Sequence, residues 1–273
     1  QDLSGTPKED LKAGKWAISN KENIKDFTAI GYFFAKKLYA ELKIPIGIIN
    51  TSWGGTCVET WTSSQAFEKS DEFKDMIAGV PSVNMDAIFE TYKKSLLDNI
   101  QKIQGFEVTE ANQDQFATPD FKDANWPEIK VPSLWENQQI GNIDGVVWMR
   151  KTITLTAEQA KKEAVLYLSK VDDQDITYVN GVQVGTNNIW DAKRVYKIPA
   201  GVLKEGTNVI AVKIIDYSGG GGIYGDPADL KIVFNGSAFP LDGLWKFNVV
   251  NVKVSVSPNS YPSLLYNAMV NPL

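Results

Sequence analysis

The sequence has no histidine in its 273 residues and a single cysteine, Cys57. Without histidine, this polypeptide alone provides no Ser-His-Asp or Cys-His catalytic group and no imidazole ligand for a metal ion. One cysteine also excludes an internal disulfide bond. A hydrolase function would therefore need a general base from outside these residues.

Long hydrophobic runs and basic runs are missing as well. No apolar run approaches the roughly 20 residues that a membrane-spanning helix needs. The formal net charge is -5 and no basic stripe is visible, so we expect neither a nucleic-acid nor a membrane partner. What is present is an apolar content of 43%, with 8 Trp, 10 Tyr and 12 Phe, which is enough for the core of one large domain or two smaller ones.

The pattern of residues 1–109 predicts part of an α/β domain. Residues 1–25 form a polar loop in which Trp16 is the only large anchor. Apolar spacings of three and four predict helices over 27–38 and 85–103, and Thr62-Ser63-Ser64-Gln65 matches a capping box that starts a helix through Phe67 and Phe73. Between them, 44–50 is a short run rich in isoleucine that does not alternate with polar residues, which is typical of a parallel strand covered on both faces.

The sequence pattern of residues 110–236 is typical of an all-β domain. Short alternating runs follow one another at 146–155, 164–168, 175–179, 182–185, 194–198, 208–215 and 229–234. Asn180-Gly181 between two runs predicts a hairpin, because a type I′ turn needs positive φ at both central residues. We expect an antiparallel sandwich of the jelly-roll kind, followed by a return segment over 237–273 with a short helix at 264–269.

The stretch Trp53-Gly54-Gly55-Thr56 directly follows the predicted strand 44–50. In open α/β sheets such turns lie at the carboxyl edge of the strands, where ligands bind. Glycines leave backbone N–H groups uncovered, and two free N–H groups there would stabilise an oxyanion. The alternative is a tight strand-to-helix turn that needs glycine for its geometry alone.

The stretch "FTAIGYFFAKKLYAELKIPIGIINTSWGGTCVETWTS" resembles the sialate O-acetylesterase family of SGNH hydrolases. The tail "SLLYNAMVNPL" is similar to the Leu-Tyr-Asn-Gly-Met segment of that family, and "DGVVWMRKTITL", "DDQDITYVNGVQVG" and "GGGGIYG" resemble the galactose-binding-like jelly roll that interrupts its hydrolase domain. The resemblance implies an incomplete, flavodoxin-like three-layer α/β domain over 1–109 and 237–273, with an inserted all-β sandwich.

The resemblance also implies an activity and a site. The family removes acetyl groups from sugar hydroxyls through a serine acyl-enzyme, without metal or cofactor, in a secreted or periplasmic setting. Its oxyanion-hole glycine falls on Gly54 or Gly55. Independently of the resemblance, the aromatic faces of Trp53 and Trp61, with Thr56 between them, suit the ring of an O-acetylated sugar or glycan, and ordinary packing of the two tryptophans is the equally weighted alternative. The blocks Gly-Gln-Ser-Asn, Gly-Glu-Ser-Asn and Asp-x-x-His-Pro, which hold the family's nucleophile, oxyanion-hole asparagine, catalytic acid and base, do not occur in this sequence. The expected partners therefore include flanking segments of the same enzyme.

Several alternatives stay open at the level of sequence. The chain could be a non-catalytic carbohydrate-binding or scaffolding module, with a sugar platform of Trp126, Trp135, Trp148 and Trp190. Ser52 and Cys57 lie beside the glycines but have no base to activate them. The 172–175 run of Asp and Gln could bind calcium or could simply be solvated, and the 219–222 glycines are expected to form a flexible loop.

Overall fold

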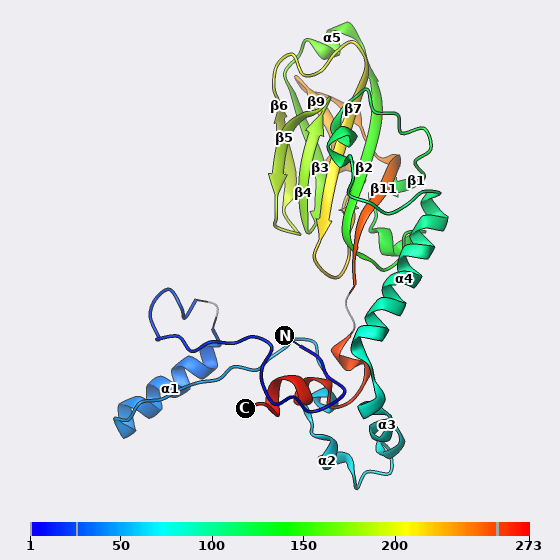
Figure 1. Ribbon diagram of the computed structural model, residues 1–273. Helices are drawn as coiled ribbons and strands as arrows, with labels where there is room; N and C mark the ends of the chain where they lie inside the picture. Colours follow the sequence, from blue (N-terminus) through cyan, green and yellow to red (C-terminus); the bar gives the residue numbers. More distant parts are fainter. Residues whose placement is uncertain (1, 26, 255–256) are drawn as a thin grey trace. The chain divides into compact units, whose positions relative to one another are not determined.

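A computed structural model describes residues 2–25, 27–254 and 257–273, and it divides into two compact units (Figure 1). Unit 1 is discontinuous in sequence and comprises Gln1–Phe89 with Val256–Leu273. Unit 2 is the continuous stretch Glu90–Ser255. The described residues contain no helix that is long and apolar enough to cross a membrane.

Unit 2 is built from two antiparallel sheets. The six-stranded sheet has the order β1-β11-β2-β7-β4-β5, and the second sheet has the order β10-β9-β3-β6, with β8 paired to β3. The strands of the first sheet are β1 (Glu128–Val131), β2 (Asp144–Leu155), β4 (Gln174–Val179), β5 (Val182–Asn187), β7 (Gly206–Asp216) and β11 (Gly243–Lys253). Those of the second are β3 (Ala164–Asp172), β6 (Lys193–Ile198), β8 (Gly222–Tyr224), β9 (Leu230–Phe234) and β10 (Ser237–Pro240).

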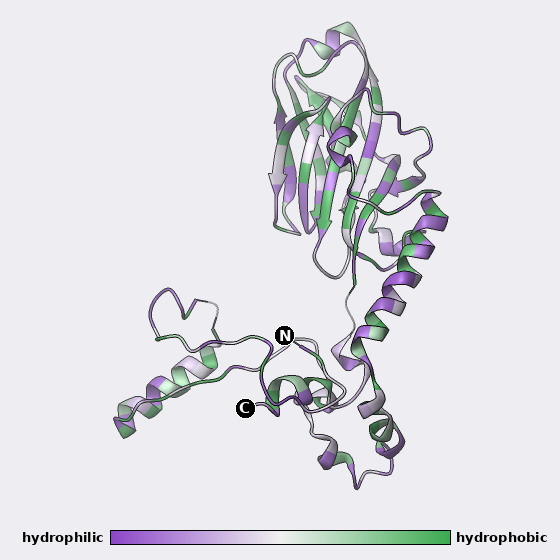
Figure 2. Cartoon of the chain, viewed as in Figure 1, coloured by the Kyte–Doolittle hydropathy of each residue, from purple (hydrophilic) through white to green (hydrophobic). Residues whose placement is uncertain are grey.

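Side-chain alternation and turn chemistry explain why these strands form. In β3, β4 and β9 buried residues alternate with more exposed ones, which places one face of each strand in the core. Figure 2 shows the corresponding alternation of hydrophobic and hydrophilic residues along the sandwich. Asn180 and Gly181 have φ of 49° and 83°, so the hairpin between β4 and β5 has the positive φ values that the sequence predicts. The prediction of an antiparallel sandwich is confirmed.

The core of unit 2 lies between the two sheets and is continuous with one side of α4 (Met85–Gln104). Leu96, Ile100 and Ile103 of this helix pack against the buried residues of the sandwich. At the end of the helix, the Gln104 side chain accepts a hydrogen bond from the Val249 N–H (3.1 Å) and donates one to the Val249 carbonyl (3.3 Å). This pairing satisfies backbone groups of β11 as a neighbouring strand would.

The sandwich continues beyond residue 236, where the sequence pattern placed its end. β10 pairs with β9, and β11 lies between β1 and β2. Residues 237–253 therefore belong to the two sheets, and the expectation that they form a return segment is wrong for this part of the chain. The error arises because the "LWKFNVV" run shows little alternation: the interior of β11 is buried on both faces.

Unit 1 consists of short helices joined by irregular segments. The helical elements are α1 (Ala29–Leu42), η1 (Val58–Trp61), α2 (Ser64–Phe67), α3 (Lys74–Gly79), η2 (Val80–Ser82), η6 (Pro258–Ser260) and η7 (Tyr266–Val270). Thr28 caps α1 by accepting a hydrogen bond from the Gly31 N–H (3.3 Å). The predicted helices near 27–38, 85–103 and 264–269 are confirmed.

Two expectations for unit 1 are not met. Residues 44–50 are not part of any sheet, and Ile44 and Ile49 are each 51% exposed, so the predicted buried strand is absent. A lone strand has no partner for its backbone groups, and none of the described segments of unit 1 supplies one. The helix predicted through Phe67 and Phe73 is two short helices, α2 and α3, and its cap is Ser63, which accepts from the Ala66 N–H (3.3 Å).

Candidate functional site

The segment 53–61 of unit 1 folds into a turn that is closed by its own side chains. The Thr56 hydroxyl donates to the Trp53 carbonyl (2.6 Å), which spans the two glycines. The Trp61 indole N–H in turn donates to the Thr56 Oγ1 (2.8 Å). The Thr56 hydroxyl therefore stabilises the turn by hydrogen bonds to the backbone of Trp53 and to the indole of Trp61.

Asn259 clamps the turn from the far end of the sequence. Its side-chain Oδ1 accepts from the Cys57 N–H (2.8 Å), and its Nδ2 donates to the Gly55 carbonyl (3.0 Å). One amide group thus fixes two backbone groups on either side of Thr56, much as a neighbouring peptide would. No local pattern in the sequence points to Asn259, since it lies 202 residues from Cys57.

Further hydrogen bonds join the same two segments behind the turn. The Ser263 N–H donates to the Glu59 carbonyl (2.9 Å), and the Leu265 N–H donates to the Thr60 hydroxyl (3.3 Å). Thr60, Ser263 and Leu265 are all buried. The turn is therefore supported by a buried contact between η1 and the segment that leads into η7. The element η7 is a π-helical turn, a rare element that is often found at functional sites.

Gly54 and Gly55 are both exposed, and a Cβ added to either would meet no atom within 4 Å. Gly55 has φ of +75°, so its conformation explains why it is glycine. Gly54 has no such requirement. Neither glycine N–H donates a hydrogen bond to any described residue. The turn therefore presents open backbone N–H donors to solvent, which is the feature that an oxyanion site requires.

The described part of unit 1 places no acid–base pair beside this turn. The chain contains no histidine, and Ser52 and Cys57 are exposed without a hydrogen-bonded base. The site therefore offers electrostatic donors, but the described residues do not supply an activated nucleophile.

A separate cavity of about 550 Å³ lies in unit 1, between the 15–24 loop, α1 and residues 46–48. Its aromatic lining comes from Trp16, Phe27, Tyr32 and Tyr39. None of the residues of the 53–61 turn lines it. Trp53 and Trp61 are half-buried.

The other motifs singled out by sequence have structural roles. Trp126, Trp135 and Trp148 are 6%, 0% and 2% exposed, so a platform made of all four tryptophans is ruled out and only Trp190 lies on the surface. A Cβ on Gly221 would come within 1.9 Å of the Trp135 ring, so this glycine is packed and is not part of a flexible loop. Asp175 forms a buried ion pair with Arg194 (2.8 Å), and the described residues include no group of three or more His, Cys, Asp or Glu placed to hold a metal ion.

Comparison with known proteins finds similarity over about a third of the chain. Sialate O-acetylesterase from Pongo abelii is 35% identical over 101 residues, which covers 33% of this chain and 18% of that protein. The Homo sapiens protein of that name is 34% identical over the same length, and the Rattus norvegicus protein is 31% identical over 68 residues, 25% of this chain and 11% of that protein. This chain is similar to part of sialate O-acetylesterase. The matches span less than a fifth of the length of these relatives, and no family model matches the chain.

Several solved structures with local similarity to this chain are β-glucuronidases. The enzyme from Bacteroides uniformis aligns with a TM-score of 0.35 and 22% identity, over 50% of this chain and 16% of its own. A β-glucuronidase from an uncultured Clostridium species gives a TM-score of 0.33 and 19% identity, over 37% and 18% of the two chains. TM-scores at this level do not establish a shared fold.

Proposed function

We propose that this chain is part of a carbohydrate esterase of the sialate O-acetylesterase type, which hydrolyses acetyl esters on sugar hydroxyls. The observation on which the proposal rests is the exposed turn at Gly54 and Gly55, whose N–H groups donate to none of the described residues and whose backbone is clamped by Asn259. One of the two glycine N–H groups stabilises the oxyanion that forms when the ester is attacked. Trp53 and Trp61 flank the sugar.

The serine nucleophile and the histidine base come from further segments of the same enzyme, because this chain contains no histidine. Support for this part of the proposal comes from α1, which has no buried residue, and from the extended 44–50 segment, which exposes Ile44 and Ile49. Apolar surface of this kind is usually covered by a partner. Added strands beside 44–50 complete the α/β layer of a secreted or periplasmic enzyme that needs no cofactor.

Acetate release from an O-acetylated sialic acid tests the proposal. The 273 residues alone release no acetate above background, whereas a longer polypeptide of the same gene that includes a Ser and a His block does. Absence of activity in the longer polypeptide, with its fold verified by circular dichroism, contradicts the proposal.

Gly54→Ala in the longer polypeptide tests the role of the turn. The new methyl group meets no protein atom within 4 Å and Gly54 does not require positive φ, so the fold is unaffected, but the methyl group stands beside the N–H donors. We expect kcat for acetate release to fall about 10- to 100-fold, less than the roughly 10²–10³ that loss of an oxyanion donor costs, because alanine keeps its N–H and the methyl group only crowds the substrate. The control is Gly79→Ala. The added methyl group also meets no atom within 4 Å, and Gly79 belongs to α3 and not to the 53–61 turn. Equal kcat for Gly54→Ala and the unsubstituted enzyme would refute the role of the turn.

A second candidate is a non-catalytic carbohydrate-binding or scaffolding module. It is favoured by unit 2, which has its own core between two sheets and presents Trp190 at 55% exposure.

A further inference from the structure

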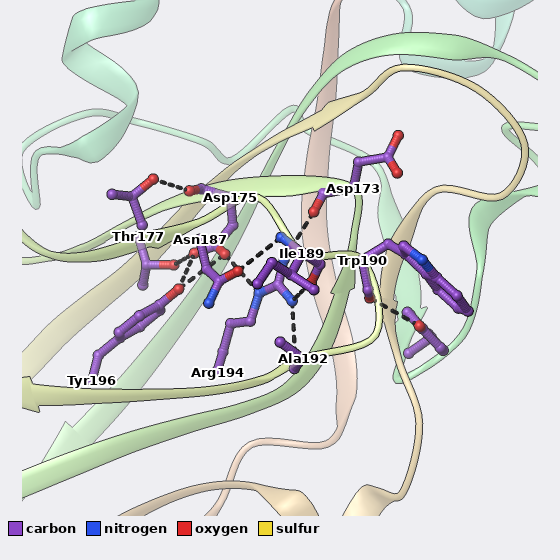
Figure 3. A network of polar contacts seen from close by, with 11 residues as sticks. Asp173, Asp175, Thr177, Asn187, Ile189, Trp190, Ala192, Arg194 and Tyr196 are labelled. Atoms are coloured by element: carbon purple, nitrogen blue, oxygen red, sulfur yellow. Dashed lines mark hydrogen bonds and ion pairs between the residues drawn. The ribbon is translucent and has the colours of Figure 1, made fainter. Parts of the chain in front are cut away.

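The loop between β5 and β6 displays an aromatic side chain to solvent. Ile189 and Trp190 are each 55% exposed. The described residues place no aromatic ring against the Trp190 indole and no Lys or Arg over it. In Figure 3 the indole points away from the polar network behind it. An exposed tryptophan is common enough, but this one lies on a loop that is held unusually firmly.

Arg194, which is 1% exposed, holds the loop from beneath. Its Nη1 donates to the carbonyls of Ile189 (2.5 Å) and Ala192 (2.7 Å), and its Nη2 donates to the Asp173 carbonyl (3.0 Å). One guanidinium therefore fixes three backbone carbonyls at one edge of the sandwich (Figure 3). The planar fork of five donors suits this task, which a lysine could not perform.

The charge of Arg194 is balanced within the core. Its Nε donates to Asp175 Oδ1 (2.8 Å), and the same carboxylate accepts from the Thr177 hydroxyl (2.6 Å) and the Tyr196 hydroxyl (3.0 Å). These bonds satisfy both buried charges. From the other side, the Tyr224 hydroxyl donates to the Trp190 carbonyl (2.9 Å). The backbone that bears Trp190 is therefore held by both Arg194 and Tyr224, which fixes the point from which the indole extends.

Carboxylates lie around this loop. Burial raises the pKa of the Tyr224 hydroxyl, and the charges of Asp172 and Asp191 act in the same direction. Burial and the neighbouring Asp173 raise the pKa of Asp172 to about 6. The Asp173 carboxylate points away from Arg194 and accepts from the Tyr217 N–H (2.8 Å). The exposed indole and these acidic side chains therefore belong to the same edge, joined through Tyr224, whose hydroxyl bonds to the Trp190 carbonyl and is acted on by the charges of Asp172 and Asp191.

We propose that the Trp190 loop is a docking platform for a neutral pyranose unit of a glycan. The apolar C–H face of the ring stacks on the indole, whose large apolar body is well suited to this contact. Sugar hydroxyls donate to the carboxylates of Asp172, Asp173 and Asp191 in charge-assisted bonds. The same carboxylates repel the carboxylate of a sialic acid, so the platform takes a sugar other than the anionic one. The platform rests on the second candidate function, a carbohydrate-binding module, and gives it a ligand class; it is independent of the 53–61 turn and of the esterase proposal.

A small organic cation is the other ligand that aromatic and acidic groups attract. Cages for quaternary ammonium groups use several aromatic faces around one centre. Here the Tyr224 ring already has the Lys170 ammonium 5.8 Å from its centroid, and no aromatic ring among the described residues packs against the Trp190 indole, so these residues form no cage of several faces. A single flat face favours the pyranose.

The test uses the 273-residue chain on a printed array of neutral and sialylated glycans, followed by calorimetry with the strongest neutral binder. We expect binding to neutral glycans, and a loss of about tenfold or more in affinity for Trp190→Ala, which corresponds to about 1.4 kcal/mol. Tyr224→Phe keeps the ring but removes the bond to the Trp190 carbonyl, and weakens binding less. Because Trp190 is exposed, its substitution leaves the thermal melt unchanged, which separates loss of binding from loss of fold.

Trp16→Ala is the matched control, because Trp16 is an exposed tryptophan of unit 1, 73% accessible, and its removal leaves binding unchanged. Four outcomes overturn the platform: no neutral glycan bound, sialylated glycans bound as tightly as neutral ones, full affinity in Trp190→Ala, or displacement of the glycan by choline. Acetate release plays no part in these readouts, so the platform and the esterase function fail separately.

Discussion

Asp216 ends β7 as a buried carboxylate, 1% exposed, whose Oδ2 has no hydrogen-bond partner among the described residues. Burial raises its pKa to about 7, and the nearby charges of Asp144, Asp173 and Glu136 act in the same direction. Its other oxygen accepts from the Ser218 N–H (3.0 Å), which opposes the shift. The residue therefore binds a proton more tightly in the folded chain than in the unfolded one.

The raised pKa of the Asp216 carboxyl determines whether the free energy of unfolding rises or falls with pH. The contribution of Asp216 to stability is complete below its unfolded pKa, near 3.8, and is lost as pH rises through about 7. We expect the free energy of unfolding to fall over this window by at most about 1.4 kcal/mol per pH unit at this site, and Asp216→Asn to flatten the fall. Urea unfolding at a series of pH values measures the free energy of unfolding of both the unsubstituted chain and the variant.

The control for this prediction is Asp229→Asn. A hydrogen bond from Lys193 lowers the pKa of Asp229, so its stabilisation is present above the unfolded pKa and is lost as pH falls. Its substitution should change the pH profile at the acidic end only. A profile for Asp216→Asn that runs parallel to that of the unsubstituted chain would show that Asp216 is not protonated on folding.

At the scale of elements, α1 and the sandwich strands differ in what stabilises them. α1 is 14 residues long and has no buried residue. A helix of this length without tertiary packing is marginally stable in water. By contrast, β2 and β7 pair along their whole length and supply many residues of the core. Local stability within one chain should therefore vary widely between these elements.

Hydrogen exchange of the 273-residue chain tests this difference. We expect the amides of α1 to exchange far faster than those of β7, and Thr28→Ala to accelerate exchange in α1 further, because loss of an N-cap costs about 1 kcal/mol. Thr156→Ala, which removes the cap of α5 (Ala157–Ala160) in unit 2, is the control and leaves exchange in α1 unchanged. Protection of α1 equal to that of β7 would mean that its apolar side is already covered.

At the scale of the whole molecule, the two units differ in how complete their cores are. The buried core residues of unit 2 come from both sheets and from α4. Unit 1 exposes large apolar residues along its chain, including Ile18, Ile30 and Val58, at 84%, 85% and 72%. Unit 2 therefore has the features of an autonomous domain, whereas unit 1 has apolar surface that is left uncovered.

Expression of residues 85–254 alone tests the autonomy of unit 2. We expect a single cooperative thermal transition, because the fragment keeps both sheets and the part of α4 that packs on them. Its midpoint should agree with the main transition of the 273-residue chain. Residues 1–89 alone are the comparison and should melt without cooperativity. A fragment 85–254 that does not unfold cooperatively would show that unit 2 depends on unit 1.

What the sequence determined by itself is the set of features that depend on local chemistry. The strands β2–β7 and β9, the Asn180-Gly181 hairpin and the helix at 85–103 follow from periodicity and from the φ that each turn requires, and the structure confirms them, whereas β1 and β8 had no signal in the sequence pattern. The uncovered backbone at Gly54 and Gly55 could also be expected, since glycine has no Cβ, but the sheet edge on which the sequence placed this turn is absent from the described residues.

Only the tertiary structure decided which segments meet. Asn259 binds the turn across 202 residues, Arg194 binds carbonyls of the β5–β6 loop and of Asp173 between β3 and β4, and β11 inserts between β1 and β2. The same is true of burial: three of the four tryptophans proposed as a platform lie in cores, and 44–50 lies outside any sheet. Side-chain burial and strand pairing depend on neighbours that are distant in sequence, so no local pattern can specify them.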